Sequence, residues 1–256
     1  MQKRDIPQSL TCQQCRNSEP LDFDFSMAFQ PIVDTQNERI FGYEALVRGL
    51  QGQPARDVIS QVTDENVYRF DQDCRVIAIR LAAQLDIRSY VSINFLPNAV
   101  YRPEQCIRTT LEAAEVHGFP IERILFEVTE VERVESNEHL SNIVKYYQTK
   151  GFKTALDDFG AGYAGLNLLA SFQPNIIKLD MELIRDIHLN PIKRTIVSKM
   201  VELNDELGIT TLAEGVESRE EMIALRTLGI HLFQGYYFAK PEFESLPLVD
   251  SAVYSI

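Results

Sequence analysis

The sequence predicts an α/β protein, a modified (β/α)₈ TIM-like barrel with one antiparallel strand near its N-terminus. From Tyr90 onward, short apolar runs alternate with helical stretches, which is typical of a mainly parallel sheet covered by helices. Eight apolar runs occur within 256 residues, and this number and length suit one closed barrel. The first two runs are joined only by the short turn DTQNE, so one of them is expected to run antiparallel to the others.

Capping residues indicate where several of the expected helices begin or end. Gly118, Gly151, Gly208 and Gly229 each follow a helical stretch, where a C-cap glycine is common. Ser218 is expected to cap the helix that Gly229 ends. We interpret residues 1–24 as a polar tail and residues 25–256 as one barrel domain. The expected strands are 25–33, 39–47, 90–95, 123–128, 152–157, 175–179, 209–213 and 230–233. The expected helices are 57–85, 103–117, 137–150, 163–172, one or two within 181–207, one starting at 218 and a last one within 247–256.

Composition excludes some classes of function. The net charge of −12 disfavours non-specific binding to nucleic-acid polymers or anionic membranes. No uncharged apolar run reaches about 18 residues, so we expect no membrane insertion. The N-terminus has charges but no apolar segment behind them, unlike a signal peptide. We therefore expect a cytoplasmic protein.

Two of the four cysteines, Cys12 and Cys15, form a CxxC motif in the expected tail. Such a motif can bind zinc or cycle between dithiol and disulfide. A zinc site needs two further ligands, and no second CxxC or nearby histidine pair is present. The alternative is a reduced, poorly ordered tail, and the sequence leaves both interpretations open.

Side chains bearing oxygen or nitrogen end seven of the expected strands in succession. Because the carboxyl ends of barrel strands meet on one face, we expect these side chains to lie together. Asp157 and Asp158 are adjacent acids after a buried run, and such a pair is costly unless a cation lies there. The seven strand ends carry Glu44, Asn94, Glu127, Asp157 with Asp158, Lys178, Glu214 and Gln234.

This set of ligand types favours two hard divalent cations. Mg²⁺ and Mn²⁺ prefer about six oxygen ligands, and five carboxylates with one amide suffice for two ions sharing a carboxylate. The absence of histidine from the set disfavours zinc and non-haem iron. Two such ions suit phosphoester hydrolysis, because they activate a water and stabilise phosphate oxygens. Lys178 would orient that water, neutralise the excess acid, or do both.

A dinucleotide-binding site is the main competing interpretation. Gly160, Gly162 and Gly165 form GxGxxG between a strand and a helix, and Asp180 follows Gly160 at the spacing of about 20 residues typical of that fingerprint. We reject it because the two aspartates would repel a pyrophosphate and because the other strand-end acids would be unexplained. The kinase-like DFG at 158–160 lacks the accompanying kinase motifs.

Eight short motifs, taken in order, resemble those of the EAL-domain cyclic-di-GMP phosphodiesterases. They cover about residues 25–248, and that family has a modified barrel with one antiparallel strand. The motifs are QPIV at 30–33, YEALVRG at 43–49, SIN at 92–94, EVTE at 127–130, DDFG at 157–160, IKLD at 177–180, AEGVE at 213–217 and QGY at 234–236.

The resemblance implies a role for each matching residue. One Mg²⁺ or Mn²⁺ would be held by Glu44, Asn94, Glu127 and Asp157, and a second by Asp157, Asp158 and Glu214, with Asp157 bridging. Lys178 would position the attacking water. The substrate would be bound by Gln30, Leu46, Arg48 and Gln234, with Arg48 contacting a phosphate. Two further acids, Glu130 and Glu217, would hold the loop after the fifth strand and the metal face.

The resemblance also implies the reaction, which is opening of cyclic di-GMP to linear pGpG. This would lower the level of a bacterial second messenger, and a homodimer is expected. Because the chain lacks no metal ligand of the family, we favour the active enzyme over a silent cyclic-di-GMP receptor. Two departures are visible. Ala164 and Gly165 replace the usual serines of the glycine-rich loop, and Ser218 replaces threonine, so loop motion or dimer coupling is in question more than chemistry.

Overall fold

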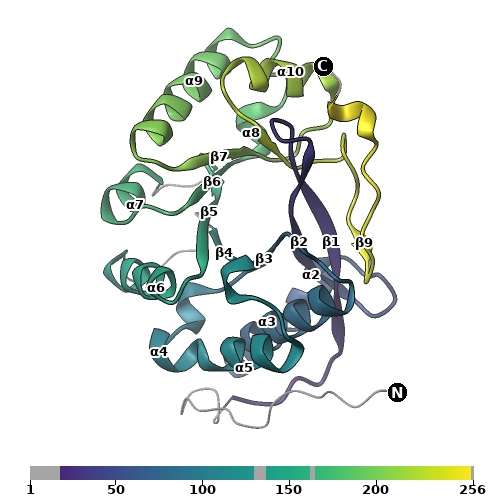
Figure 1. Cartoon of the computed structure of the whole chain (residues 1–256). Coiled ribbons are helices and arrows are strands. Elements are labelled where there is room, and N and C mark those ends of the chain that lie inside the picture. Colours follow the sequence, from purple (N-terminus) through teal and green to yellow (C-terminus); the bar gives the residue numbers. More distant parts are fainter. Residues whose placement is uncertain (1–17, 130–136, 162–164, 255–256) are drawn as a thin grey trace.

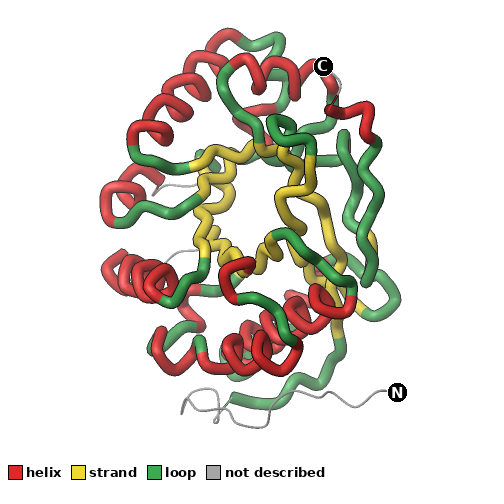
Figure 2. The backbone as a smooth tube through the Cα atoms, in the orientation of Figure 1, coloured by secondary structure: helices red, strands yellow, loops and turns green. Residues whose placement is uncertain are grey.

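A computed structural model of the chain describes residues 18–129, 137–161 and 165–254. Its strands close into a ring, with the helices outside it (Figure 1, Figure 2). The order around the ring runs from β2 through β8 to β1, and β1 pairs with β2 to close it. The strands are β1 (Phe25–Asp34), β2 (Arg39–Gly49), β3 (Tyr90–Asn94), β4 (Ile124–Thr129), β5 (Lys153–Phe159), β6 (Ile176–Leu179), β7 (Thr210–Ala213), β8 (Leu232–Phe233) and β9 (Glu242–Phe243).

The predicted antiparallel strand is β1. It runs antiparallel to both of its ring neighbours, β2 and β8, whereas β2 to β8 are parallel to one another. The prediction of a modified (β/α)₈ barrel is thus confirmed. Strand β9 was not predicted; it lies outside the ring and pairs with β1 through Ala28 and Phe29 (Figure 1). A strand of two residues is too short to leave a pattern in the sequence.

The expected helices 57–85 and 103–117 are each divided into two shorter ones, and the stretch 181–207 holds two helices, within the one or two expected. Asn190 caps a new helix at Pro191, which divides the stretch 181–207 into two helices. The expected last helix is only a 3₁₀ turn, Ser251–Tyr254. The other α-helices are α2 (Ala55–Ile59), α3 (Val67–Gln84), α4 (Pro103–Cys106), α5 (Arg108–His117), α6 (Asn137–Thr149), α7 (Gly165–Ser171), α8 (Met181–Ile184), α9 (Pro191–Glu206) and α10 (Arg219–Thr227), with 3₁₀ turns at Pro97–Ala99 and Ile121–Arg123.

The packed chain begins before Phe25, where the first strand was expected. Leu21 and Phe23 are buried in the main core, while Asp22 and Asp24 between them are exposed. This alternation continues the period of a strand backwards into the stretch that we interpreted as tail. Cys12, Cys15 and Glu130 lie outside the described residues. Within the described part of the chain, no helix is long and apolar enough to cross a membrane.

The inside of the barrel is filled by a small apolar layer, one side chain from each of six strands. We call it the plug, and it is separate from the larger core between barrel and helices. Because alternate residues of a strand point to the same side, the residue two positions beyond each plug residue also points into the barrel. The plug consists of Ile32, Leu125, Ala155, Ile176, Leu212 and Leu232.

Candidate metal centre

The layer above the plug is polar, and it contains the residues that the sequence singled out. On the parallel strands these residues follow the plug by two positions, as Glu127 follows Leu125. On antiparallel β1 the order reverses, so Gln30 precedes Ile32. The same period brings Glu44 on β2 and Asn94 on β3 into the layer. The two-residue period of the strands therefore accounts for the whole set: Gln30, Glu44, Asn94, Glu127, Asp157, Lys178, Glu214 and Gln234.

The ammonium of Lys178 lies at the centre of this layer, and its side chain is fully buried. Its Nζ atom is 2.9 Å from Glu127 Oε2 and 3.1 Å from Asp157 Oδ1. It is 2.6 Å from Glu214 Oε1 and 3.7 Å from Glu44 Oε2. One cation thus contacts four carboxylates. The layer keeps an excess of negative charge, which is the condition for binding further cations.

Amide side chains hold Glu44 in place from two sides. Asn94 Nδ2 donates to Glu44 Oε1 at 2.8 Å, and Gln234 Nε2 donates to Glu44 Oε2 at 2.6 Å. Gln234 Nε2 also lies 3.2 Å from Gln30 Oε1, and Gln30 Nε2 donates to the carbonyl of Ala239. Both oxygens of Glu44 are therefore oriented by donors from neighbouring strands. This preorganisation is what a ligand carboxylate needs.

The carboxylates form two groups that could each hold a metal ion, and Asp157 belongs to both. The first is Glu44, Glu127 and Asp157, and the second is Asp157, Asp158 and Glu214; in each, one oxygen from every residue lies within 4.8 Å of the others. Glu127 Oε1 is buried with no hydrogen-bond partner among the described residues. Oxygen donors, excess negative charge and an unsatisfied buried oxygen all fit a hard divalent cation.

Burial shifts the protonation of these acids in the metal-free protein. Burial raises the pKa of Glu127 well above its ordinary value; Lys178 opposes this, while Glu44 adds to it. Burial and the charge of Asp157 likewise raise the pKa of Glu214. Burial alone would lower the pKa of Lys178, but the surrounding carboxylates raise it well above its usual value. The lysine therefore carries a positive charge in the metal-free protein.

Asp158 lies at a bend where β5 leaves the barrel. Its φ of 53° is in the left-handed region, and the register with β6 shifts between Leu156 and Phe159. Aspartate tolerates that region better than most residues. Gly160, also left-handed at 102°, lies so close to α8 that a Cβ there would be 2.4 Å from a Leu183 methyl. Asp180 caps α8 by accepting from Glu182 N. Gly160 and Asp180 thus have structural roles that need no dinucleotide.

Burial, then the charges of Asp157 and Asp180, raise the pKa of Asp158 to about 6 from 3.8. The folded protein therefore binds a proton at Asp158 more tightly than the unfolded chain does. The free energy of unfolding should fall as pH rises through the window from about 4 to 6. We expect Asp158→Asn to be more stable than the parent above pH 6 in EDTA, and similar to it near pH 4.

Thermal unfolding of both proteins between pH 4 and 7 in EDTA measures this difference. Glu220→Gln removes an exposed acid of α10 and is the matched control, which should follow the parent at every pH. A stability difference that is constant across the range would contradict the assignment of the titration to Asp158.

The other predicted site residues lie farther from the carboxylates. Leu46 and Arg48 follow Glu44 on the same face of β2 and are half-buried; Arg48 Nη1 donates to the carbonyl of Val47. Glu217 is half-exposed and pairs with Arg185 at 2.7 Å. These residues lie around the acidic layer. Among the described residues, none of them forms an ion pair with Lys178.

Sequence reasoning did not assign Glu221, which holds the loop that follows β7. Its carboxylate accepts from the backbone N–H groups of Glu217, Ser218 and Asp186, and its side chain is nearly fully buried. It thereby ties the end of α8 to the segment that carries Glu214. The signal was present as a capping box, because Ser218 is followed three residues later by glutamate.

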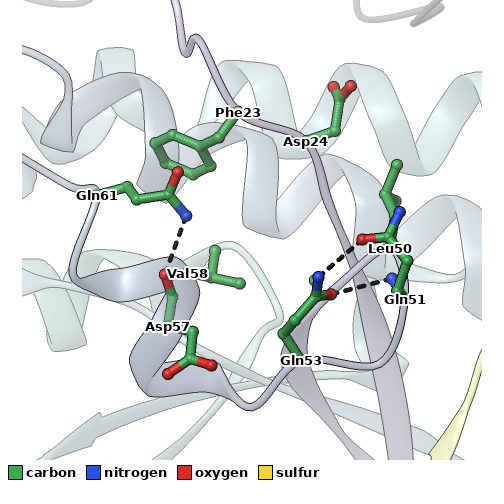
Figure 3. Close-up of a pocket in the computed structure, with 9 residues that line it drawn as sticks. Phe23, Asp24, Leu50, Gln51, Gln53, Asp57, Val58 and Gln61 are labelled. Carbon is green, nitrogen blue, oxygen red and sulfur yellow. Dashed lines mark hydrogen bonds between the residues drawn. The ribbon is translucent and has the colours of Figure 1, made fainter.

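Two hollows open near the strand ends, and one of them borders the layer. One, of about 340 Å³, borders the metal groups and is lined by Glu44, Asp158 and Glu214 together with the exposed side chain of Tyr236. The other, of about 410 Å³, lies beyond the end of β2 (Figure 3). Its rim is set by Gln53, whose side chain accepts from Gln51 N and donates to Gln51 Oε1. The first hollow has the position and size for a ligand that reaches the metal groups.

Comparison with known proteins identifies the family of this barrel. The sequence model of the EAL domain matches residues 18–241. The chain belongs to the EAL domain family. Among solved structures, it is similar to a stand-alone EAL protein from Vibrio cholerae solved with c-di-GMP bound. The two chains are 59% identical with a TM-score of 0.89, and the match covers 91% of this chain and 99% of that one.

Other similar proteins are longer. BlrP1 of Klebsiella pneumoniae, solved with manganese and c-di-GMP, is 37% identical with a TM-score of 0.82 over 89% of this chain and 58% of that one. The antirepressor BluF of Escherichia coli is 32% identical over 87% of this chain and 55% of its own length. PdeD, a probable cyclic di-GMP phosphodiesterase of E. coli, is 26% identical over 89% and 42%. The chain thus spans about half the length of these curated relatives.

Proposed function

We propose that this EAL domain hydrolyses cyclic di-GMP to linear pGpG with two divalent cations, Mg²⁺ or Mn²⁺. One observation carries the proposal: two carboxylate groups share Asp157 and border an open hollow. Shared-carboxylate pairs of this kind hold two ions about 3.5–4 Å apart in phosphoester hydrolases. The relatives that are named for this activity, and those solved with c-di-GMP, support the same substrate.

In this proposal each residue of the layer has a defined task. Glu44, Asn94, Glu127 and Asp157 would hold one ion, and Asp157, Asp158 and Glu214 the other. When bound, the ions supply an activated water and neutralise charge on the phosphate. Lys178 holds four of the carboxylates in place through its ion pairs, and it orients the water. The water oxygen would form a bond to phosphorus as the bond from phosphorus to the 3′ oxygen breaks, and the proton that the water loses balances the one that the 3′ oxygen gains on leaving as a hydroxyl.

Substrate contacts are proposed for residues at the rim. Gln30 and Gln234 lie in the layer, and Leu46 and Arg48 extend from it along β2. Arg48 would bind a phosphate, which a half-buried guanidinium does well. Glu217 would brace the loop after β7 through Arg185, and Glu130 would act on the loop after β5.

The deciding experiment is chromatography of cyclic di-GMP after incubation with the purified protein. We expect conversion to pGpG with Mg²⁺ or Mn²⁺ and none with EDTA. If the protein binds cyclic di-GMP but makes no pGpG after long incubation with Mn²⁺, it is a receptor and the proposed activity is wrong.

Metal binding is predicted independently of turnover. An ion that binds only the folded state stabilises it, by about 2.7 kcal/mol when present at a hundred times its Kd. We expect Mn²⁺ or Mg²⁺ to raise the melting temperature of the parent and to have little effect on Asp157→Asn, which removes the shared charge. Glu220→Gln should respond like the parent. A shift of equal size in Asp157→Asn would contradict the placement of the site.

We further propose a homodimer in the cytoplasm. Leu189 just before α9, and Ile192 and Ile196 within it, are exposed apolar residues, as expected of a surface that packs against a partner. Among the described residues, the buried Cys74 forms no disulfide, which fits a reducing compartment. We expect the parent to sediment as a dimer and Ile192→Glu as a monomer. A monomeric parent at high concentration would exclude the dimer.

A further inference from the structure

The barrel face opposite the carboxylates carries a row of cations. A cation stands at the N-terminal end of each of four neighbouring strands. Arg39 begins β2, Arg88 lies two residues before β3, Arg123 immediately precedes β4, and Lys153 begins β5. Since β2 to β5 are adjacent and parallel, these ends lie at one edge of the sheet. Four to six strand residues separate this basal edge from the metal groups, a distance of roughly 13–20 Å along the strands.

A hollow of about 650 Å³ lies at this edge, and we call it the basal hollow. Three arginines line it, together with an aromatic wall of Phe41 and Tyr90, whose ring centroids are 4.8 Å apart with the planes 27° from parallel. Both rings are half-buried, and both also line a neighbouring hollow of about 240 Å³ that contains Lys153. Volumes of 300–1,000 Å³ are usual for small-molecule sites.

The charges here differ in sign from those of the chain as a whole. Arg39 pairs with Asp34 at 3.3 Å, and Arg88 with Asp86 at 2.9 Å. In the described ranges, Arg123 and Lys153 have no carboxylate within ion-pair distance. Four cations and one carboxylate, Asp86, line the two hollows of a protein whose net charge is −12.

The chemistry that this wall recognises has two parts. Guanidinium groups bind phosphate oxygens through paired, charge-assisted hydrogen bonds. Aromatic side chains bind flat rings and also support cations near them. A ligand that uses both must carry phosphate and a planar ring within a few ångströms of each other.

We propose that the basal hollow is a second ligand site, which binds a nucleoside phosphate. Its phosphates would lie against Arg88 and Arg123, and its base against Phe41 and Tyr90. The site does not depend on the proposed hydrolysis, because it shares no residue with the metal groups.

Calorimetric titration of the full chain with GDP in EDTA tests the proposal. EDTA removes the divalent cations proposed for the carboxylate layer, and Arg123→Ala, which leaves that layer intact, distinguishes GDP bound at the basal edge from GDP bound elsewhere. We expect one GDP per chain, bound at least about tenfold more tightly than pyrophosphate or guanosine alone. Arg123→Ala should weaken GDP binding at least about tenfold, and Phe41→Leu should weaken it several-fold.

Arg56→Ala is the matched control, since Arg56 is exposed and pairs with a neighbouring carboxylate as Arg88 does, but lies outside the hollow. It should bind GDP like the parent. All of these side chains are exposed or half-buried, so thermal unfolding should confirm folded variants. No GDP binding at millimolar concentration, or binding that Arg123→Ala leaves intact, overturns the proposal. Pyrophosphate binding as tightly as GDP shows a plain anion site and overturns the role of the aromatic wall.

Discussion

Replacing Glu44 by glutamine is expected to lower kcat/KM for cyclic di-GMP at least about 100-fold, the scale on which preorganised charge in an active site contributes. Each oxygen of Glu44 accepts one amide hydrogen bond, from Asn94 and from Gln234, so the carboxylate is held in one orientation. Glutamine keeps the shape, but it loses the charge and one of the two acceptors. The first proposed metal position is therefore weakened.

The measurement is initial rates of pGpG formation over a range of Mn²⁺ concentrations. Excess Mn²⁺ should restore little activity, because the variant lacks the negative charge of the Glu44 carboxylate. Glu220→Gln serves as the control for loss of a carboxylate elsewhere, and it should retain the parent's rate. Since Glu44→Gln removes repulsion within a crowded acidic layer, its melting temperature in EDTA should not fall far. Full activity in Glu44→Gln would contradict the proposed mechanism.

Most of the candidate site could be predicted because the strands obey one period. A plug residue such as Leu125 is apolar and Glu127 two positions later is polar, and the same step recurs on β5, β6 and β7. Closure of the barrel then brings the strand ends together without further information. The shared role of Asp157 was expected from the family resemblance, and the geometry of the two carboxylate groups is consistent with it.

Other features left no periodic signal in the sequence. The capping box predicts the bond between Glu221 and Ser218, but the bond that Glu221 accepts from Asp186 N depends on how the chain after α8 packs. In most amphipathic helices the charged residues lie on the exposed face. Instead Asp71 and Arg75 are among the most buried side chains of the protein. Local propensity cannot reveal a buried ion pair, because it exists only when partners from other elements surround it.

That buried pair leads to the second large effect, a loss of stability on removal of Asp71. Arg75 Nη2 donates to Asp71 Oδ2 at 2.5 Å, and Arg75 Nη1 donates to the hydroxyl of Tyr147 on α6. The guanidinium also lies over the rings of Phe95 and Phe126, at 5.5 and 5.3 Å from their centroids. Burial raises the pKa of Asp71, and Arg75 opposes this. In Asp71→Ala the guanidinium stays buried without its counter-charge.

Breaking such a pair from one side costs about 3–5 kcal/mol, which for a chain of this size lowers the melting temperature by on the order of 10 °C. We expect this for Asp71→Ala, while Gln84→Ala, at the exposed end of the same helix, should change little. The double variant Asp71→Leu with Arg75→Met removes both charges and should recover much of the loss. If its loss in free energy of unfolding equals the sum of the losses in the two single variants, the two residues are not coupled.

The same pair also links α3 to the metal layer, so its loss should be felt there. Asp71 Oδ1 accepts from Leu96 N, two residues beyond Asn94, and Arg75 packs on the rings that flank Asn94 and Glu127. We therefore expect folded Asp71→Asn, titrated with Mn²⁺ by calorimetry well below its melting temperature, to need several-fold more Mn²⁺ for half-saturation. If the variant is less stable but binds Mn²⁺ like the parent, the ion pair stabilises the core and does not affect the metal site. Weaker Mn²⁺ binding by the folded variant would instead show that α3 positions two strand ends of the site.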